Sequence, residues 1–236
     1  LCDSLYALKK IVFEEKRISF KEIVNALACN FEGQEYEALR IRLINKYDKY
    51  GNDNDEVDNI SSDILRYYSK AVERYTTPRG GSFTPGSYTV SAHVPLGEAV
   101  GATPDGRKDK EQLADGGLSP MVGRDMLGPT AVLKSVSKLD NYLTTNGSLL
   151  NVKFNPKALE GKEGINKLSA FLLAFMKLKI QHVQFNVISV DTLKKAQANP
   201  NDYKGLVVRV AGYSAFFTEL SKEIQNDIIR RTEHRL

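Results

Sequence analysis

The 236-residue sequence contains no tryptophan, only two cysteines (Cys2 and Cys29) and three histidines (His93, His182 and His234). Two cysteines cannot build a disulfide framework, and the scattered histidines do not have the spacing of a zinc site. We therefore expect no disulfide scaffold and no metal centre. Proteins without a disulfide framework are typical of a reducing compartment, so the sequence predicts a cytoplasmic protein.

The sequence also lacks a long apolar run and a strong charge of one sign. The longest apolar stretch, Leu168 to Met176 with one serine, is about half of what a membrane span needs. The 33 basic and 29 acidic residues are interleaved and give a net charge of +4, too small an excess to favour a nucleic-acid partner. We expect neither a membrane nor a nucleic acid as partner. With 42% apolar residues, the chain is long enough to bury a core without covalent staples.

Residues 1–76 have the periodicity of helices. Asp3 can cap a first helix, and Ser19 with Glu22 forms a capping box before a second. Glu35–Tyr47 and Asp55–Arg74 are the third and fourth candidates.

Residues 77–130 change character, because they hold six of the eight prolines and ten of the 17 glycines. Only Ser87–Val94 has the alternation of a strand. Asp105-Gly106-Arg107 is interpreted as a turn with an exposed ion pair. A loop of this length inside a domain is usually functional or a linker.

The last third of the chain alternates between strand and helix patterns, which favours an α/β region with parallel pairing. The predicted strands are Leu149–Phe154, His182–Ile188 and Leu206–Val210. The predicted helices are Ala131–Leu143, one starting at Asn155-Pro156, Ile165–Lys179, Asp191–Gln197, Ala215–Leu220 and Lys222–Thr232.

Three short motifs have simple structural interpretations. Asn52–Glu56 lacks the central glycine and terminal glutamate of a calcium loop, so we interpret it as the start of a helix. Gly80-Gly81 and Gly116-Gly117 do not match the phosphate-binding glycine patterns. His182 is interpreted as a packed or capping imidazole.

Near the C-terminus a buried β-branched strand runs directly into Arg209-Val210-Ala211-Gly212-Tyr213. This pattern alone fits an ordinary strand end with a glycine at positive φ. It also resembles the radical-site signature of the glycyl radical enzymes, with Gly212 lying 24 residues from the end.

Further segments resemble the same family in order along almost the whole chain. They are Tyr50–Asp53, Ala102–Arg107, Ala114–Pro120, Gly128–Ser135, His182–Asn186 and Ile228–Glu233.

The resemblance implies that Gly212 carries an unpaired electron on its Cα. Glycine suits this role because a Cβ would hinder the planar radical carbon, while the amide nitrogen donates and the carbonyl withdraws electron density. The cofactor is then the radical itself, with none bound, installed by an activating enzyme that uses an iron–sulfur cluster and S-adenosylmethionine.

Four neighbours are expected to support the radical loop: Arg209, Ala211, Tyr213 and Ser214. We expect Arg209 to anchor the loop through a buried carboxylate and Tyr213 to pack the tip. Burial of the loop should keep oxygen away, through Val207, Val208, Val210, Phe216 and Phe217. Replacing Gly212 by alanine should leave folding nearly intact if its φ is negative.

Members of the family also need a thiyl cysteine on a second loop, followed closely by a glutamate. Cys2 and Cys29 do not match that pattern, so we expect this chain to be the C-terminal part of a larger enzyme and inactive by itself. The implied fold is an α/β one, the last part of a ten-stranded barrel with outer helices. Residues 1–100 are assigned to the helical part of the barrel domain and residues 101–236 to the glycine radical domain. The isolated fragment should expose apolar surface and be poorly stable.

Within the family, Gly117–Pro120, Asp140–Leu143 and Val208–Phe217 most resemble the branch that eliminates a substituent, and in it the coenzyme-B12-independent glycerol and propane-1,2-diol dehydratases. This implies an anaerobic lyase acting on a small diol, homodimeric at full length. Three alternatives stay open: a pyruvate formate-lyase or another eliminating lyase, an autonomous radical-bearing spare subunit, and a non-catalytic remnant.

Overall fold

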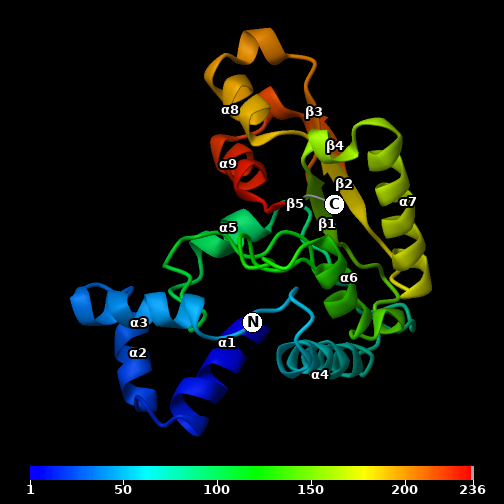
Figure 1. Ribbon diagram of the computed structural model, residues 1–236. Coiled ribbons are helices and arrows are strands. Elements are labelled where there is room, and N and C mark those ends of the chain that lie inside the picture. The colour runs from blue at the N-terminus through cyan, green and yellow to red at the C-terminus, as the bar shows by residue number, and fades with distance from the viewer. Residues whose placement is uncertain (235–236) are drawn as a thin grey trace.

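The computed structural model describes residues 1–234, which form helices around a small parallel sheet and a separate hairpin (Figure 1). The helices are α1 (Cys2–Leu8), α2 (Phe20–Ala28), α3 (Gln34–Asn45), α4 (Asp55–Val72), α5 (His93–Glu98), α6 (Pro129–Ser137), α7 (Gly161–Lys177), α8 (Val190–Ala198) and α9 (Lys222–Arg230). A π-helical segment, η1 (Lys9–Glu14), continues α1. Short 3-10 turns are η2 (Asn141–Leu143), η3 (Pro156–Leu159), η4 (Pro200–Tyr203) and η5 (Phe217–Glu219).

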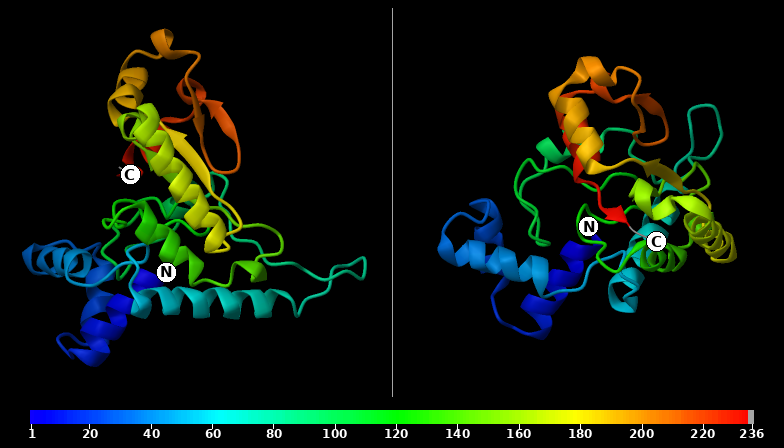
Figure 2. Two further views of the ribbon diagram at one scale, coloured as in Figure 1. Left: turned by 45° about the vertical axis from the view of Figure 1, so that its right-hand side comes forward. Right: turned by 45° about the horizontal axis from the view of Figure 1, so that its top comes forward.

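Within residues 1–234, five strands form two sheets. The first has the order β2-β1-β5 and is parallel, built from β1 (Asn151–Phe154), β2 (Gln184–Val187) and β5 (Glu233–His234). The second is an antiparallel hairpin of β3 (Val207–Arg209) and β4 (Ser214–Phe216). Helix α7 makes the crossover from β1 to β2 and lies along the sheet (Figure 2). Parallel neighbours need such a crossover, so the predicted parallel pairing is confirmed here.

Two hydrophobic cores hold these elements. The larger one joins the N-terminal helices to α6, α7 and the parallel sheet, where Phe171 of α7 packs edge-on against Phe154 at 5.5 Å between ring centroids. The smaller one lies between the hairpin, α8 and α9, around Leu193, Val208 and Ile228. The hairpin therefore belongs to a core of its own.

The N-terminal helices follow local capping signals. The capping box of Ser19 and Glu22 forms at the start of α2. Asn54 caps α4 by accepting from the main-chain N–H groups of Glu56 and Val57, which confirms the helix-start interpretation of this segment. Asp3 does not cap α1; it lies inside the helix, and its buried carboxylate accepts from the Tyr50 N–H at 2.8 Å.

Within residues 77–130 the predicted strand at Ser87–Val94 is wrong. Ser87 makes a single parallel bridge with Ser148, Val90 has a φ of +55°, and His93 begins α5. A β-branched residue in the left-handed region interrupts an extended strand, and the alternation in the sequence does not reveal it.

The exposed ion pair at Asp105 and Arg107 is also wrong, because both side chains are buried. Asp105 accepts from Ser4 and Thr103. Arg107 donates to the main-chain oxygens of Val100, Gly101, Lys108 and Glu111. The guanidinium, which has five N–H donors, thus satisfies main-chain oxygens that would otherwise be bonded within a helix or a sheet.

Two predicted helices of the C-terminal half differ. Ala215–Leu220 is not a helix: Ala215 pairs with Val208 in the hairpin, and the 3-10 turn η5 follows. Ala131–Leu143 is divided into α6 and η2. At Ala215 the hairpin pairing overrides the local helix propensity.

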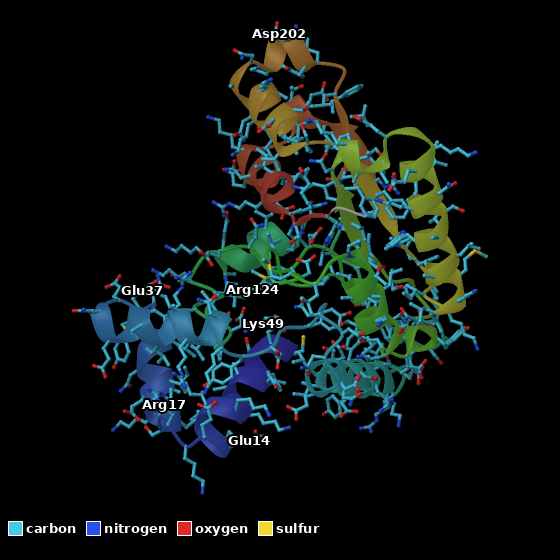
Figure 3. All side chains as sticks on the ribbon, in the orientation of Figure 1. Glu14, Arg17, Glu37, Lys49, Arg124 and Asp202 are labelled. Carbon is cyan, nitrogen blue, oxygen red and sulfur yellow. The ribbon has the colours of Figure 1, made fainter. Side chains whose placement is uncertain are left out.

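Charged side chains of both signs cover the periphery, as Glu14, Arg17 and Asp202 illustrate in Figure 3. No helix within residues 1–234 has the length and hydropathy to cross a membrane.

Candidate functional site

Gly212 lies at the tip of the β3–β4 hairpin. The last strand pair is Arg209 with Ser214, and the Val210 N–H then donates to the Tyr213 oxygen at 2.9 Å to close the turn. Gly212 has a φ of +88°, a conformation that L side chains rarely adopt. A Cβ placed on it would meet only the Leu149 Cδ1 atom, at 3.6 Å, so glycine is required here by backbone conformation and not by lack of space.

Within residues 1–234, the apolar residues of the hairpin do not cover Gly212, contrary to expectation. Gly212 is exposed, and Val207 and Phe216 are 54% and 44% exposed. Val208, Val210 and Phe217 are buried, but they belong to the smaller core with α8 and α9. Side chains alternate along a strand, so two of these five apolar residues face away from that core.

Two side chains of β2 hold the hairpin against the parallel sheet. Gln184 and Asn186 are two residues apart and therefore share one face of the strand. The Asn186 Oδ1 atom accepts from the Arg209 N–H at 2.8 Å, and its Nδ2 donates to the Arg209 oxygen at 2.5 Å. The Gln184 Oε1 atom accepts from the Gly212 N–H at 3.1 Å. The two amides thus extend the parallel sheet toward the glycine through side chains.

Among the residues that the structure describes, Arg209 contacts no carboxylate, contrary to expectation. Its Nε donates to Gln184 Oε1 at 2.9 Å, its Nη1 to Ser214 Oγ at 3.2 Å and its Nη2 to the Gly212 oxygen at 3.4 Å. Arg209 therefore bonds directly to the residue at the tip. Of the other expected supports, Ala211 is buried, Tyr213 is half-buried against the smaller core, and Ser214 is exposed. Their roles in a radical site stay predictions.

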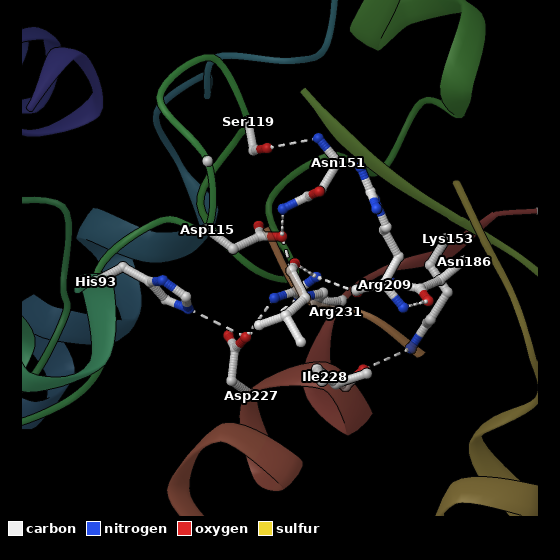
Figure 4. A network of polar contacts seen from close by, with 12 residues as sticks. His93, Asp115, Ser119, Asn151, Lys153, Asn186, Arg209, Asp227, Ile228 and Arg231 are labelled. Atoms are coloured by element: carbon white, nitrogen blue, oxygen red, sulfur yellow. Dashed lines mark hydrogen bonds and ion pairs between the residues drawn. The ribbon is translucent and has the colours of Figure 1, made fainter. Parts of the chain in front are cut away.

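The buried carboxylates are bound by a different arginine, Arg231, which follows α9. Its side chain is 4% exposed; its Nε lies 3.0 Å from Asp115 Oδ2 and its Nη2 2.7 Å from Asp227 Oδ2 (Figure 4). Nη1 donates to the Val210 oxygen at 2.7 Å. Arg231 thus connects the hairpin to α9 and to the glycine-rich segment that contains Asp115.

Burial and the charge of Arg231 shift the pKa values of the two carboxylates in this cluster in opposite directions. Burial raises the pKa of Asp115, and Arg231 opposes that shift. Burial also acts to raise the pKa of Asp227, but a hydrogen bond from His93 and the charge of Arg231 lower it overall. His93 Nε2 lies 3.1 Å from Asp227 Oδ2, and Gln112 donates to Asp227 Oδ1 at 2.8 Å. Helix α5 and the segment after it are thereby joined to α9.

Lys153 is a second buried basic group beside this cluster. Its Nζ donates to the main-chain oxygen of Ile229 at 3.1 Å and, at 3.4 Å, to that of Ile228. Burial lowers its pKa to about 8, because the ammonium is removed from water. A cavity of about 20 Å³ lies between Lys153, Asp115 and Arg231, a size that suits one water molecule.

A larger, mainly apolar cavity of about 750 Å³ lies between α1, α4 and residues 100–119. Cys2 lines it, and burial raises the pKa of that thiol to about 11. Cys29 ends α2, and its Sγ donates to the Ala26 oxygen at 3.4 Å. His182 is half-buried beside β2, and burial together with Arg209 lowers its pKa, consistent with its interpretation as a packed imidazole.

Two family models match the chain. Residues 114–218 match "Glycine radical", and residues 1–97 match "Pyruvate formate lyase-like". The first of these contains the hairpin and Gly212. The chain belongs to the glycyl radical enzyme family.

Curated relatives match the chain over nearly all of its length. A probable dehydratase, YbiW, from Escherichia coli K12 is 46% identical over all of this chain and 30% of its own length. An isethionate sulfite-lyase from Nitratidesulfovibrio vulgaris is 44% identical over 98% of this chain and 28% of its own length. The chain therefore spans less than a third of these relatives.

Solved structures agree with the fold. The B12-independent glycerol dehydratase from Clostridium butyricum superposes with a TM-score of 0.95 at 49% identity, over 100% of this chain and 29% of that chain. The hydroxyproline dehydratase from Clostridioides difficile gives 0.94 at 40% identity, over 100% and 29%. The prediction of an α/β chain that forms part of a pyruvate formate-lyase-like barrel is confirmed. The domain division between residues 100 and 101 stays a prediction.

The sequence patterns did not reveal Gln184 and Arg231 as site residues. Both lie in segments that resemble the family, His182–Asn186 and Ile228–Glu233. That resemblance is the one feature of the sequence that could have pointed to them. Nothing in their local spacing shows that they meet the hairpin, because Gln184 and Arg231 are separated from Gly212 by 28 and 19 residues.

Proposed function

We propose that Gly212 carries a stable backbone radical and that this chain is the radical-bearing part of a lyase that dehydrates a small diol. One observation carries the proposal: Gly212 occupies the tip of a hairpin, with its N–H bonded to Gln184 and its carbonyl to Arg209. That geometry lies inside the segment matching the glycine radical family.

The residues of this chain fix the radical position. Gln184 and Asn186 hold the hairpin from the sheet, and Arg231 holds it from α9. The absence of a Cβ at Gly212 leaves its Cα free to become planar when a hydrogen atom is removed. In the family that hydrogen is removed by an activating enzyme with an iron–sulfur cluster and S-adenosylmethionine, which we propose as the partner.

The thiyl cysteine is assigned to polypeptide outside this chain. The Cys2 thiol is held protonated by burial, and Cys29 ends α2 at the opposite end of the molecule from the hairpin in Figure 1. Residues 1–234 alone are therefore proposed to be inactive. The working enzyme is proposed to be a homodimer in the cytoplasm of an anaerobic cell.

The proposed reaction converts a 1,2-diol into an aldehyde and water. A thiyl radical takes a hydrogen atom from C1, the C2 hydroxyl leaves as water with acid–base assistance, and the cysteine returns the hydrogen atom to C2 of the product. The similarity to the glycerol dehydratase, and to a propanediol-dehydrating enzyme from Roseburia inulinivorans at 46% identity, supports this substrate class. A sulfite-lyase is the second candidate, since an isethionate sulfite-lyase is 44% identical.

The test uses the native protein purified from anaerobic cells that express its activating enzyme. We expect an electron-spin doublet that disappears in air, together with cleavage at Gly212 detected by mass spectrometry. The activated protein is then given glycerol, propane-1,2-diol and isethionate separately. Aldehyde from a diol supports the dehydratase; sulfite from isethionate supports the second candidate. An activated protein that stays intact in air contradicts the radical assignment.

A further inference from the structure

The strongest unassigned feature is a chain of hydrogen-bonded side chains that begins at Gly212 and ends at the buried ion pair of Arg231. Gln184 Oε1 accepts from the Gly212 N–H, Gln184 Nε2 donates to Asn151 Oδ1, and Asn151 Nδ2 donates to Asp115 Oδ2 at 2.7 Å. Gln184, Asn151 and Asp115 are here called the amide relay.

The contacts at both ends of the amide relay determine which atom of each amide donates and which accepts. At the far end, Asp115 Oδ2 receives donors from Asn151 and from Arg231, which has no acceptor, so this oxygen is an acceptor in either protonation state. Asn151 must therefore turn its oxygen toward Gln184. At the near end, Arg209 Nε donates to the same Gln184 oxygen at 2.9 Å. If the side-chain amide of Gln184 were rotated by 180°, its NH₂ group would face the N–H donors of Gly212 and Arg209. If that of Asn151 were rotated, its NH₂ group would face the NH₂ donor of Gln184.

The two ends of the relay are buried, and Asn151 between them is half-buried. Gln184 and Asp115 are 7% and 5% exposed, and Asn151 receives a further restraint because its N–H donates to Ser119 Oγ at 3.0 Å. In such surroundings a satisfied polar network selects one arrangement, because an unpaired group is costly. The relay thus presents a fixed acceptor to the Gly212 N–H.

The opposite side of Gly212 carries a donor. Arg209 Nη2 lies 3.4 Å from the Gly212 oxygen. A radical on the Cα is stabilised when the nitrogen donates and the carbonyl withdraws electron density. An acceptor on the N–H increases the donation by nitrogen, and a cationic donor on the oxygen increases the withdrawal by the carbonyl. The two contacts therefore act in the same direction.

We propose that the amide relay and Arg209 tune the glycyl radical, polarising the N–H and the carbonyl of Gly212 so that spin spreads away from the Cα. Gln184 is the residue that acts directly on the radical residue, while Asn151 and Asp115 act by positioning it. This inference rests on the proposed radical at Gly212.

The experiment is electron paramagnetic resonance and electron–nuclear double resonance spectroscopy of the native, anaerobically activated protein labelled with ¹⁵N-glycine. Gln184→Met keeps the length of the side chain and removes the acceptor. We expect a wider doublet from the remaining Cα hydrogen, a smaller ¹⁵N coupling, and a radical yield lower by about threefold to tenfold, the contribution of one hydrogen bond.

Three further variants separate tuning from structure. Gln184→Glu, measured at a pH where the carboxyl is protonated, keeps both the acceptor for the Gly212 N–H and the donor to Asn151, and should restore the wild-type splitting. Asn151→Leu frees the Gln184 amide and should shift the splitting in the same direction as Gln184→Met. Gln181→Met alters an exposed glutamine three residues earlier and should change nothing.

The possible outcomes are distinguishable. A doublet in the wild type that is unchanged in Gln184→Met overturns the tuning role and leaves the proposed function intact. A wild-type protein with no doublet after activation overturns the proposed function, and the tuning role with it. If Gln184→Met does not fold, the comparison of Gln184→Glu with Asn151→Leu decides, since equal splittings in those two variants would also overturn the relay.

Discussion

Arg231 donates a hydrogen bond to the main-chain oxygen of Val210 across 2.7 Å, two residues before Gly212. The same guanidinium lies against two buried carboxylates, Asp115 and Asp227. One side chain thus joins the hairpin tip, helix α9 and the glycine-rich segment. The position of Gly212 depends on all three.

Replacing Arg231 by methionine should therefore be strongly destabilising. The substitution leaves Asp115 and Asp227 buried without their cation, and breaking a buried ion pair costs about 3–5 kcal/mol. The measurement is urea-induced unfolding of the native protein. The neighbouring Arg230 is exposed, and Arg230→Met should change stability by less than about 0.5 kcal/mol. Equal effects of the two substitutions would show that the buried contacts of Arg231 contribute little.

Gly212→Ala should abolish the radical and also reduce stability. The expectation that folding stays nearly intact required a negative φ, whereas the residue has a φ of +88°. A left-handed conformation costs a non-glycine residue about 1–2 kcal/mol. Gly205→Ala is the matched control, since Gly205 has no heavy atom within 4 Å of an added Cβ and is not at positive φ. Electron-spin resonance measures the radical, and unfolding curves measure the stability. A radical signal in Gly212→Ala would place the unpaired electron on another residue.

Lys153 should make stability depend on pH in the alkaline range. Burial lowers its pKa to about 8 from the 10.5 of a free lysine. Between these two values the unfolded chain binds more protons at this site than the folded one, so the lysine's contribution to stability rises with pH from about 8 to 10.5 and is flat below 8. Lys153→Met should remove that rise. The check is the difference between wild-type and variant unfolding free energies across this range, which cancels the other titrating groups; a constant difference would contradict the shifted pKa.

Arg107 should control the order of the irregular segment around it. Its buried guanidinium donates to four main-chain oxygens, and Arg107→Met leaves these acceptors unpaired. Each buried unpaired group costs about 1–3 kcal/mol. We expect faster proteolytic cleavage within residues 100–115 than in the wild type. Arg79→Met, at an exposed position, is the control; unchanged cleavage in Arg107→Met would mean that the segment is ordered by other contacts.

Local signals in the sequence were sufficient for most helices. The capping box at Ser19 and the cap at Asn54 act between residues three apart or fewer, so they work in any context. The same holds for Gly212, since Arg209–Tyr213 is a contiguous pattern that resembles the family. The errors fell where contacts longer than a helical turn decide. Ala215 lies in a strand because it pairs with Val208, seven residues earlier, and Arg107 is buried among main-chain oxygens that lie up to seven residues away.

The sequence by itself determined the helical caps, the α/β alternation, the position of Gly212 and the family to which the chain belongs. Only the tertiary structure decided which side chains surround the glycine. Gln184 and Arg231 reach the hairpin from another strand and another helix, and the carboxylates expected at Arg209 are instead bound by Arg231. Short-range preferences are encoded in spacing, whereas a polar network depends on the packing of elements that are far apart in the chain.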